Sequence, residues 1–412
     1  MNVLSKHAIG KVLRDDALKL SSEAKIAKHK DQSVIDGTLG IFYYEDGKFH
    51  THKIVKQVFE SLNDEEIYLY STSDGGVDFQ NATINHLFRE TRVDIEEDML
   101  IKCIATPGGT GALVSSCYLS LDMGETLLIP TPCWGPYVGI AEHRNINISK
   151  FFMFDNDVFN LKGFREKADE IIKKQNKLVF FLNDPCNNPT GYSMKDKEMN
   201  DLINYLNSTN VPCVLVYDCA YMDVASEGIN KTREHLKLFK KCNDNIIVCL
   251  CLSYSKTYFI YGQRLGAQII IGKDKKAVTD FYNAANYLAR NTWSNCNKGM
   301  ISLVTSVDKD KNKRLALDNE LSIVQDLLKK RSEIFINEAK EVGLYFYPYS
   351  GGFFISVPCK DNKLVYEKLK EEEKVYLLPM NGILRVAICS LPIKDIKGLA
   401  YKIKRVIDKY AV

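Results

Sequence analysis

A lysine and an arginine lie eight residues apart in the segment CLSYSKTYFIYGQRLGA, at Lys256 and Arg264. The residues before the lysine, NIIVCLCLS, are continuously apolar and predict a strand that is buried on both faces. Loops that follow such strands often hold reactive groups. A lysine amine there is a candidate for covalent chemistry or proton transfer, and a fixed arginine charge suits an anion. An ordinary surface lysine is the alternative.

Three other segments place polar residues at the ends of predicted elements. Residues 106–113, TPGGTGAL, lead into a predicted helix whose free N–H groups could bind a phosphate, although such turns are often only structural. Residues 183–193, NDPCNNPTGYS, follow an apolar run and put Asn188 near the edge of a sheet, unless they form a purely local turn. The run PCVLVYD ends on Asp218, which needs a charged or donor partner or is a helix N-cap, and Tyr221 follows it.

The elements that must position these segments alternate between strands and helices. This alternation predicts an α/β fold with a mainly parallel sheet and helices on both faces. The predicted helices cover residues 111–123 and 196–210, and the predicted strands cover residues 125–130, 177–184, 212–218, 245–253 and 266–272.

The pattern changes near residue 310. Residues 311–343 predict one long amphipathic helix that ends at Gly343, and residues 345–358 and 382–390 predict strands of a smaller α+β unit. The first 45 residues lack the alternating pattern and are expected to pack with that unit. The predicted domains are therefore a large one over residues 46–310 and a smaller one formed by residues 1–45 and 311–412.

Composition narrows the possible classes of function. The chain has 412 residues with 45% hydrophobic and 26% charged content, which are ordinary values for a soluble globular protein. A net charge of +3 without a basic block argues against nucleic acid as a partner. No apolar stretch is long enough for a membrane helix, and the first 20 residues resemble neither a signal peptide nor a transit peptide.

The 12 cysteines do not follow a disulfide or metal pattern. Cys213, Cys249 and Cys251 lie inside apolar runs, and no paired C-x-x-C spacing occurs near histidines. Reduced thiols used as small hydrophobic side chains fit better. We therefore expect a cytoplasmic protein without a metal site.

Taken in order, these motifs resemble those of the class I pyridoxal-phosphate aminotransferases of fold type I, and most closely the aspartate and aromatic aminotransferase branch. The resemblance covers nearly the whole chain. It implies a seven-stranded, mainly parallel sheet in the large domain, a smaller α+β domain from both termini, pyridoxal 5'-phosphate as cofactor, and a homodimer with shared active sites. It also implies a ping-pong exchange of an amino group between an L-amino acid and a 2-oxo acid. The matching segments are NNPTG, DCAY, SYSK with its following arginine, LRVAI, YSTSDGGVDF, TPCWGPY and RNTWSN.

The resemblance also assigns residues to the cofactor. Lys256 would bind the aldehyde covalently and then shuttle the proton of the substrate Cα. Asp218 would pair with the pyridine nitrogen, Tyr221 and Asn188 would hydrogen-bond the phenolic oxygen of the ring, and Trp134 would stack on it. The residues implied for the phosphate are Arg264, Ser253, Gly109 and Thr110, with Tyr70 contributed by a neighbouring subunit.

Two arginines would bind the substrate. Arg385 fits the group that binds the α-carboxylate through two hydrogen bonds. Arg290 fits the one that reaches from the partner subunit to a side-chain carboxylate, which favours aspartate and glutamate, unless it is a solvated helix end. Phe42 replaces a small glycine of relatives, which leaves an apolar or aromatic substrate open, and Tyr137 replaces a histidine behind Asp218. The segment SNCNKG lacks the paired prolines that are common in that branch.

Three other functions compete with transamination. A pyridoxal-phosphate C–S β-lyase shares Lys256, Asp218 and Arg385, but it has no need for Arg290. A regulatory module that binds the cofactor without turnover is disfavoured, because no DNA-binding segment precedes the domain. A nucleotide-binding protein built on GGTGA lacks the acidic or Lys-Ser partner that such a site requires.

Overall fold

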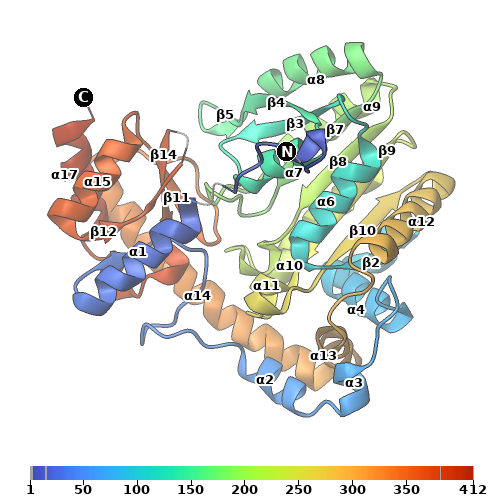
Figure 1. Ribbon diagram of the computed structural model, residues 1–412, viewed down its shortest axis with the longest axis horizontal. Coiled ribbons are helices and arrows are strands. Elements are labelled where there is room, and N and C mark those ends of the chain that lie inside the picture. Colours follow the sequence, from blue (N-terminus) through green and yellow to red (C-terminus); the bar gives the residue numbers. More distant parts are fainter. Residues whose placement is uncertain (1–2, 14–15, 381, 412) are drawn as a thin grey trace. The chain divides into compact units, whose positions relative to one another are not determined.

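The computed structural model describes residues 3–13, 16–380 and 382–411 (Figure 1). The chain forms two compact units. The larger unit contains Thr51–Pro185 and Met194–Ser322, and the smaller unit contains Met1–His50, Cys186–Ser193 and Ile323–Val412. The predicted domain limits at residues 46 and 310 remain a prediction. No pattern in the sequence indicates that the short segment Cys186–Ser193 packs with the chain ends.

A seven-stranded sheet forms the centre of the larger unit, which confirms the predicted fold class (Figure 1). Its apolar strands are buried along most of their length, as both faces of a parallel sheet require. Strand β10 runs antiparallel to its two neighbours, and the remaining pairs are parallel. The spatial order is β2 (Leu100–Thr106), β10 (Gly266–Gly272), β9 (Ile246–Ser253), β8 (Cys213–Asp218), β7 (Leu178–Asn183), β3 (Thr126–Thr131) and β4 (Asn147–Phe152).

Helices cover both faces of this sheet. On one face, α6 (Gly108–Ser120) and α7 (Pro136–His143) pack on Val179 and Phe181 of β7. On the other face, Phe164 of α8 contacts Phe180, with ring centroids 5.0 Å apart. The remaining helices of the larger unit are α2 (Lys53–Glu60), α3 (Asp64–Tyr68), α4 (Val77–Phe88), α5 (Arg92–Glu96), α8 (Leu161–Gln175), α9 (Asp196–Ser208), α10 (Ile229–Glu234), α11 (Tyr254–Thr257), α12 (Lys275–Thr292) and α13 (Lys298–Lys309), and a short hairpin joins β5 (Phe154–Asp155) to β6 (Val158–Phe159).

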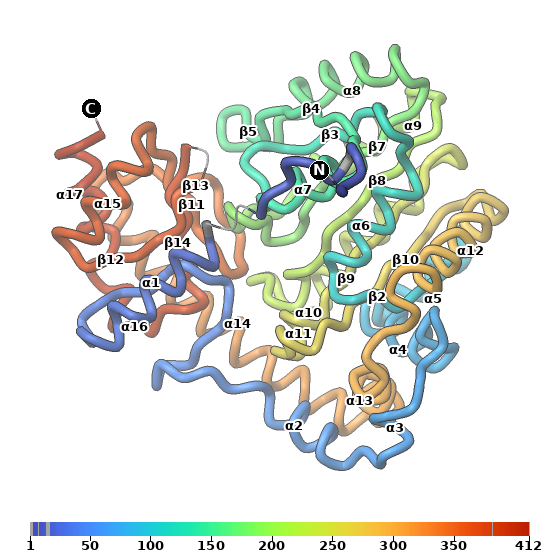
Figure 2. The backbone as a smooth tube through the Cα atoms, in the orientation of Figure 1, coloured from blue at the N-terminus to red at the C-terminus, as the bar shows by residue number. Residues whose placement is uncertain are grey.

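The smaller unit joins the two ends of the chain, as the blue α1 and red α17 of Figure 2 show. Its core is one apolar cluster that includes Ile35, Phe335, Val357 and Ile403. Its strands form the antiparallel sheet β11 (Phe354–Pro358), β14 (Ile383–Ala387) and β13 (Leu378–Met380), and a parallel pair of β1 (Ile35–Asp36) and β12 (Val375–Tyr376). Its helices are α1 (Asp16–Lys30), α15 (Asn362–Glu373), α16 (Ile393–Ile396) and α17 (Leu399–Tyr410).

The predicted long helix is α14, which spans Lys311–Glu341 and contains the limit between the two units. It ends as predicted, because Gly343 adopts a φ of +64° and the amide of Leu344 donates to the carbonyl of Ala339. The strand predicted over residues 345–358 is wrong in its first half. Gly351 and Gly352 both have positive φ, which interrupts extended pairing, and β11 therefore begins at Phe354.

Candidate active site

Asp218 is the last residue of β8 and is only 6% exposed. Its Oδ2 accepts a hydrogen bond of 2.6 Å from the Tyr137 hydroxyl, and its Oδ1 accepts one of 3.2 Å from the Ala220 amide. On the neighbouring strand, the side-chain amide of Asn183 donates to the backbone carbonyl of Asp218 over 2.7 Å and fixes the backbone at that residue. Burial raises the pKa of Asp218 to about 6, against the opposing effects of these hydrogen bonds and of the nearby Lys256 charge. A cation placed beside this carboxylate would be bound strongly.

Tyr137 is fully buried on α7 between two other aromatic rings. Its ring meets Phe181 edge to face with centroids 4.9 Å apart, and meets Trp134 in the same way at 5.6 Å. Burial and the Asp218 charge raise the pKa of Tyr137 far above its usual value, so the phenol stays neutral and donates its hydrogen. Tyr137 therefore supplies a hydrogen bond to Asp218 and no charge.

Lys256 lies on the short helix α11, directly after β9. Its ammonium nitrogen is 4.6 Å from the ring centre of Tyr261 and 5.8 Å from that of Tyr221. Tyr221 is itself buried and follows β8 by three residues. The ends of the two adjacent strands β8 and β9 thus bring the lysine and this phenol together, as predicted for chemistry at the carboxyl edge of the sheet.

Arg264 and the start of α6 form a compact anion-binding cradle. A Cβ on Gly108 would come 2.4 Å from the Arg264 guanidinium and would displace it, and the φ of +74° at Gly108 favours glycine there. A Cβ on Gly109 would come within 3.1 Å of the Ser253 side chain. The start of α6 therefore lies beside the side chains of Arg264 and Ser253, whose guanidinium and hydroxyl are donors suited to a phosphate dianion.

Arg385 and Asn188 come together in the smaller unit. Arg385 lies on β14, is 5% exposed and packs 4.1 Å from the ring centre of Phe354. Its guanidinium donates to the Asn188 side-chain oxygen over 3.0 Å and to the Thr38 carbonyl over 2.7 Å. A buried guanidinium held in this way can bind a carboxylate in place of one of these acceptors.

The two residues predicted to act across a subunit boundary are on the surface. Tyr70 is 91% exposed between α3 and α4. Arg290 is exposed near the end of α12, where it donates to the Ser294 hydroxyl over 2.5 Å. The structure brings neither of them to Lys256 or Asp218 within the chain, and their roles remain predictions.

Phe42 is wholly buried and forms part of the aromatic core of the smaller unit. Its ring is 5.1 Å from that of Tyr44 and 6.5 Å from that of Phe353, and the Arg331 guanidinium lies 4.9 Å above it. The expectation that Phe42 narrows the substrate site stays a prediction.

The sequence interpretation missed one group of buried polar residues near Lys256. His86, Asp223, Arg233 and Thr257 come from four separate segments of the larger unit and join through hydrogen bonds. The available signal was weak: Asp223 is an acidic residue close to the end of a buried strand, and nothing in the sequence indicates its partners.

The described residues contain neither a metal-binding cluster nor a membrane-spanning helix. Among residues 3–13, 16–380 and 382–411, no cluster of histidine, cysteine and acidic side chains could hold a metal ion. Within the same ranges, none of the helices has the length and apolar character needed to cross a membrane.

The sequence and the fold both match known proteins. The model of the family described as aminotransferase class I and II matches residues 34–403. Aspartate aminotransferase of Escherichia coli strain K12 is 24% identical over 346 residues, which are 82% of this chain and 85% of that protein. An aminotransferase from Anaerococcus prevotii has a TM-score of 0.94 at 29% identity over 99% of this chain and all of that chain. An aromatic-amino-acid aminotransferase from Burkholderia pseudomallei, covalently bound to pyridoxal phosphate, has a TM-score of 0.81 at 19% identity, and the match covers 99% of this chain and 100% of that one.

Proposed function

Because this chain belongs to the class I and II aminotransferase family and is a pyridoxal-phosphate-dependent transaminase, we propose that its main donor is a dicarboxylic L-amino acid such as aspartate or glutamate. The amino group passes to a 2-oxo acid in a ping-pong cycle. The observation that supports the cofactor chemistry is Asp218, a buried carboxylate at a strand end that accepts a hydrogen bond from a neutral phenol and lies near Lys256. The match to aspartate aminotransferases over most of their length supports the substrate class.

The residues around Asp218 fit the cofactor. When bound, pyridoxal phosphate supplies an aldehyde that reacts with amines and a ring that accepts electrons. We assign Asp218 to the ring nitrogen, because its raised pKa favours a cationic partner, and Tyr221 and Asn188 to the phenolic oxygen. Lys256 holds the aldehyde and, once released by the substrate amine, carries the proton that leaves the substrate Cα.

In this proposal the remaining cofactor contacts are made by the cradle at the start of α6 and by the ring of Trp134. The glycine positions that a Cβ would fill support the assignment of the phosphate to this cradle. Trp134 stacks on the cofactor ring in this proposal, and its edge-to-face contact with Tyr137 supports that placement. The residues assigned to the phosphate are Arg264, Ser253, Gly109 and Thr110, with Tyr70 from a second copy of the chain.

Arg385 binds the substrate α-carboxylate in this proposal, and Arg290 of a second copy binds the side-chain carboxylate. Aromatic amino acids are the second candidate class. The ring of Phe354 lies against the Arg385 guanidinium, and Phe353 and Phe42 continue the same aromatic group, which would suit an apolar side chain. The β-lyase alternative has no support from the family match.

The substrate class is tested with a panel of donors. Initial rates are measured for aspartate, glutamate, phenylalanine and tyrosine with 2-oxoglutarate as acceptor, and with oxaloacetate when glutamate is the donor. Arg290→Ala should lower kcat/KM for aspartate by about 2–4 kcal/mol, as loss of a charge-assisted bond does, and spare phenylalanine. Asn291→Ala, a change at the adjacent exposed position, is the control. Equal losses for both donors would exclude Arg290 from the side-chain pocket.

We also propose a homodimer in which each site takes Tyr70 and Arg290 from the other copy. An exposed apolar group on the larger unit supports it: Tyr68, Leu69, Tyr70 and Val77 are 77%, 59%, 91% and 70% exposed. Mixing Lys256→Ala with Arg290→Ala subunits would then assemble one intact site in each hybrid dimer, so random mixing should restore about a quarter of the wild-type rate with aspartate. No recovery after confirmed subunit exchange would contradict shared sites.

A cytoplasmic location remains a proposal. It rests on cysteines that pack inside the strands of the larger unit, such as Cys213 and Cys249, as small apolar side chains do in reducing compartments.

A further inference from the structure

A second buried carboxylate, Asp223, lies five residues after Asp218 in the same connection. It belongs to a short turn of 3-10 helix, Met222–Val224, that begins immediately after Tyr221. Asp223 is only 2% exposed. A carboxylate buried so deeply must be matched by donors or cations, so its partners show what it holds in place.

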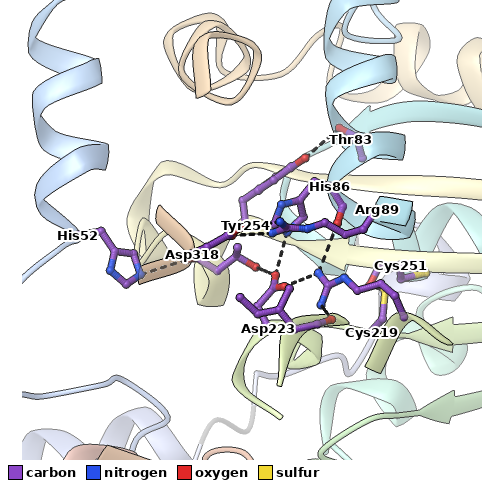
Figure 3. Close-up of polar contacts among 12 residues, drawn as sticks. His52, Thr83, His86, Arg89, Cys219, Asp223, Cys251, Tyr254 and Asp318 are labelled. Atoms are coloured by element: carbon purple, nitrogen blue, oxygen red, sulfur yellow. Dashed lines mark hydrogen bonds and ion pairs between the residues drawn. The ribbon is translucent and has the colours of Figure 1, made fainter. Parts of the chain in front are cut away.

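Three side chains from different elements converge on Asp223 (Figure 3). The Thr257 hydroxyl donates to its Oδ2 over 2.6 Å, and the His86 Nε2 lies 2.9 Å from the same oxygen. The guanidinium of Arg233 bonds to Oδ1. We call Asp223, His86, Arg233 and Thr257 the Asp223 cluster.

The cluster is buried and charge-matched. Arg233 and Thr257 are 0% and 1% exposed. Burial alone would raise the pKa of Asp223, but Arg233, His86 and the hydrogen bond from Thr257 hold it well below its usual value. The carboxylate is therefore an ionised acceptor with both oxygens in use, and the geometry around it is over-determined.

One partner of Asp223 is the residue directly after Lys256. Thr257 is held through its hydroxyl by Asp223 and through its carbonyl by His52, whose Nε2 is 3.1 Å away. The carbonyl of the next residue, Tyr258, accepts a 3.1 Å hydrogen bond from the Thr51 hydroxyl. The segment that carries Lys256 is thus fixed by contacts with the two residues that follow it.

We propose that Asp223 is a positioning residue that joins the segment carrying Tyr221 to the segment carrying Lys256. One end of this connection is covalent, because Asp223 follows Tyr221 by two residues, and the other is the Thr257 hydrogen bond. It holds the Lys256 nitrogen at its 5.8 Å separation from the Tyr221 ring. The Lys256 and Tyr221 side chains would then contact the same cofactor ring, so this inference rests on the proposed function. Small displacements of reacting groups reduce rates strongly.

The main experiment compares holoenzyme variants at saturating cofactor. Asp223→Asn keeps the shape but leaves one acceptor oxygen for three donors. We expect kcat to fall about 10- to 100-fold while KM for the amino donor changes less than about threefold, because Arg385 lies on another unit. The visible circular dichroism band of the bound cofactor, which reports how the ring is held, should also change.

A second pair of variants isolates the link to Lys256. Thr257→Val removes only the hydroxyl and should reproduce the altered visible band with a loss of kcat of about tenfold. Thr257→Ser keeps the hydroxyl and should restore both values to near wild type. This pair decides the question even if Asp223→Asn does not fold, because it leaves the contacts of Asp223 with His86 and Arg233 in place.

Asp318→Asn is the matched control. It breaks a different ion pair of the larger unit, in which both oxygens of Asp318 bond to Arg89 over 2.7 Å. It should lower Tm without changing the visible band. The proposal is overturned if Asp223→Asn and Thr257→Val lower Tm but keep the wild-type band and kcat, or if Asp318→Asn changes the band equally. Failure of the proposed substrate class would appear instead as inactive wild-type enzyme that still shows the band differences.

Discussion

Asp218 and Asp223 are two buried aspartates in one connection of the larger unit, and their surroundings have opposite effects. The donors around Asp218 are a phenol and a backbone amide, and burial raises its pKa to about 6. Asp223 is in contact with Arg233 and His86, and its pKa is held well below the usual value.

The comparison teaches that partners, and not burial, separate a ligand-binding carboxylate from a positioning one. Among the residues that the structure describes, no cation forms an ion pair with Asp218, which is therefore suited to the protonated nitrogen of a cofactor. Asp223 has its cation within the chain and is suited to holding segments in place. Substitutions at the two aspartates should therefore differ in their effects on stability, turnover and pH dependence.

The largest expected effect is on stability, because substitutions at the two aspartates should change the free energy of unfolding in opposite directions. In cofactor-free protein, Asp223→Asn should lower the free energy of unfolding by about 3–5 kcal/mol, because it leaves Arg233 without its counterion. Asp218→Asn should raise it by up to about 3 kcal/mol at pH 8, because it removes a carboxylate that burial disfavours. Urea unfolding measures both values. Destabilisation of equal size in the two variants would remove the distinction between the sites.

The second effect concerns turnover. Asp218→Asn should lower kcat about 10²- to 10³-fold, since the carboxylate that would keep the ring nitrogen protonated, and the ring thereby able to accept electrons, is lost. Asp223→Asn should lower kcat by a smaller factor, about 10- to 100-fold. Stopped-flow measurement of the first half-reaction with a saturating donor gives both rates. A larger loss for Asp223→Asn than for Asp218→Asn would reverse the assignment of the two residues.

The third effect is a pH dependence. The pKa of Asp218 is about 6 in the folded protein, against an ordinary value of 3.8, so between these two values the folded state holds a proton that the unfolded state releases. The stability of cofactor-free protein should therefore fall by about 3 kcal/mol as pH rises from about 4 to about 6. Asp223 has a lowered pKa, so its contribution is complete above its unfolded pKa and is lost only in stronger acid.

The difference between wild type and Asp218→Asn isolates this slope from the other carboxylates. Chemical unfolding of both proteins at a series of pH values provides the measurement. Parallel stability curves for the two proteins would show that Asp218 titrates normally in the folded state.

The smallest effect comes from Tyr137. Its hydroxyl lowers the pKa of Asp218, so Tyr137→Phe should raise that pKa further and weaken cofactor binding by about 1 kcal/mol. Tyr205→Phe, which removes a hydroxyl bonded to Asp169 over 2.7 Å, is the matched control. Cofactor affinities are measured by fluorescence titration. Equal changes in affinity for the two variants would show that the Tyr137 hydrogen bond has no specific effect on cofactor binding.

Much of the fold could be predicted because continuous apolar runs such as KLVFFL and GAQIIIG mark buried strands. The two edge strands β2 and β4 were not identified from their own residues. The run NISKFF in β4 has an exposed face and reads as polar, and Lys102 interrupts the apolar pattern of β2. Neither segment therefore shows the uninterrupted apolar run that marks the central strands, so composition alone does not reveal them.

The site divides in a similar way. Lys256 and Asp218 were predictable because each lies at the end of a strong strand signal, and the glycine cradle was predictable because its glycine-rich turn precedes a helical run. The Asp223 cluster was not, because its members are separated by up to 171 residues in sequence numbering, as Thr257 and His86 are, and no local pattern links them. Asn188 was expected at the edge of the large sheet, and its hydrogen bond to Arg385 depends on tertiary packing in the smaller unit.

The central claim is that Lys256 forms the covalent link to pyridoxal phosphate. Borohydride reduction of the holoenzyme followed by peptide mass spectrometry tests it most directly. The account predicts that the reduced cofactor is attached to Lys256 and to no other lysine, and that prior addition of an amino donor prevents the attachment. An unmodified Lys256, or attachment at another lysine, would contradict it.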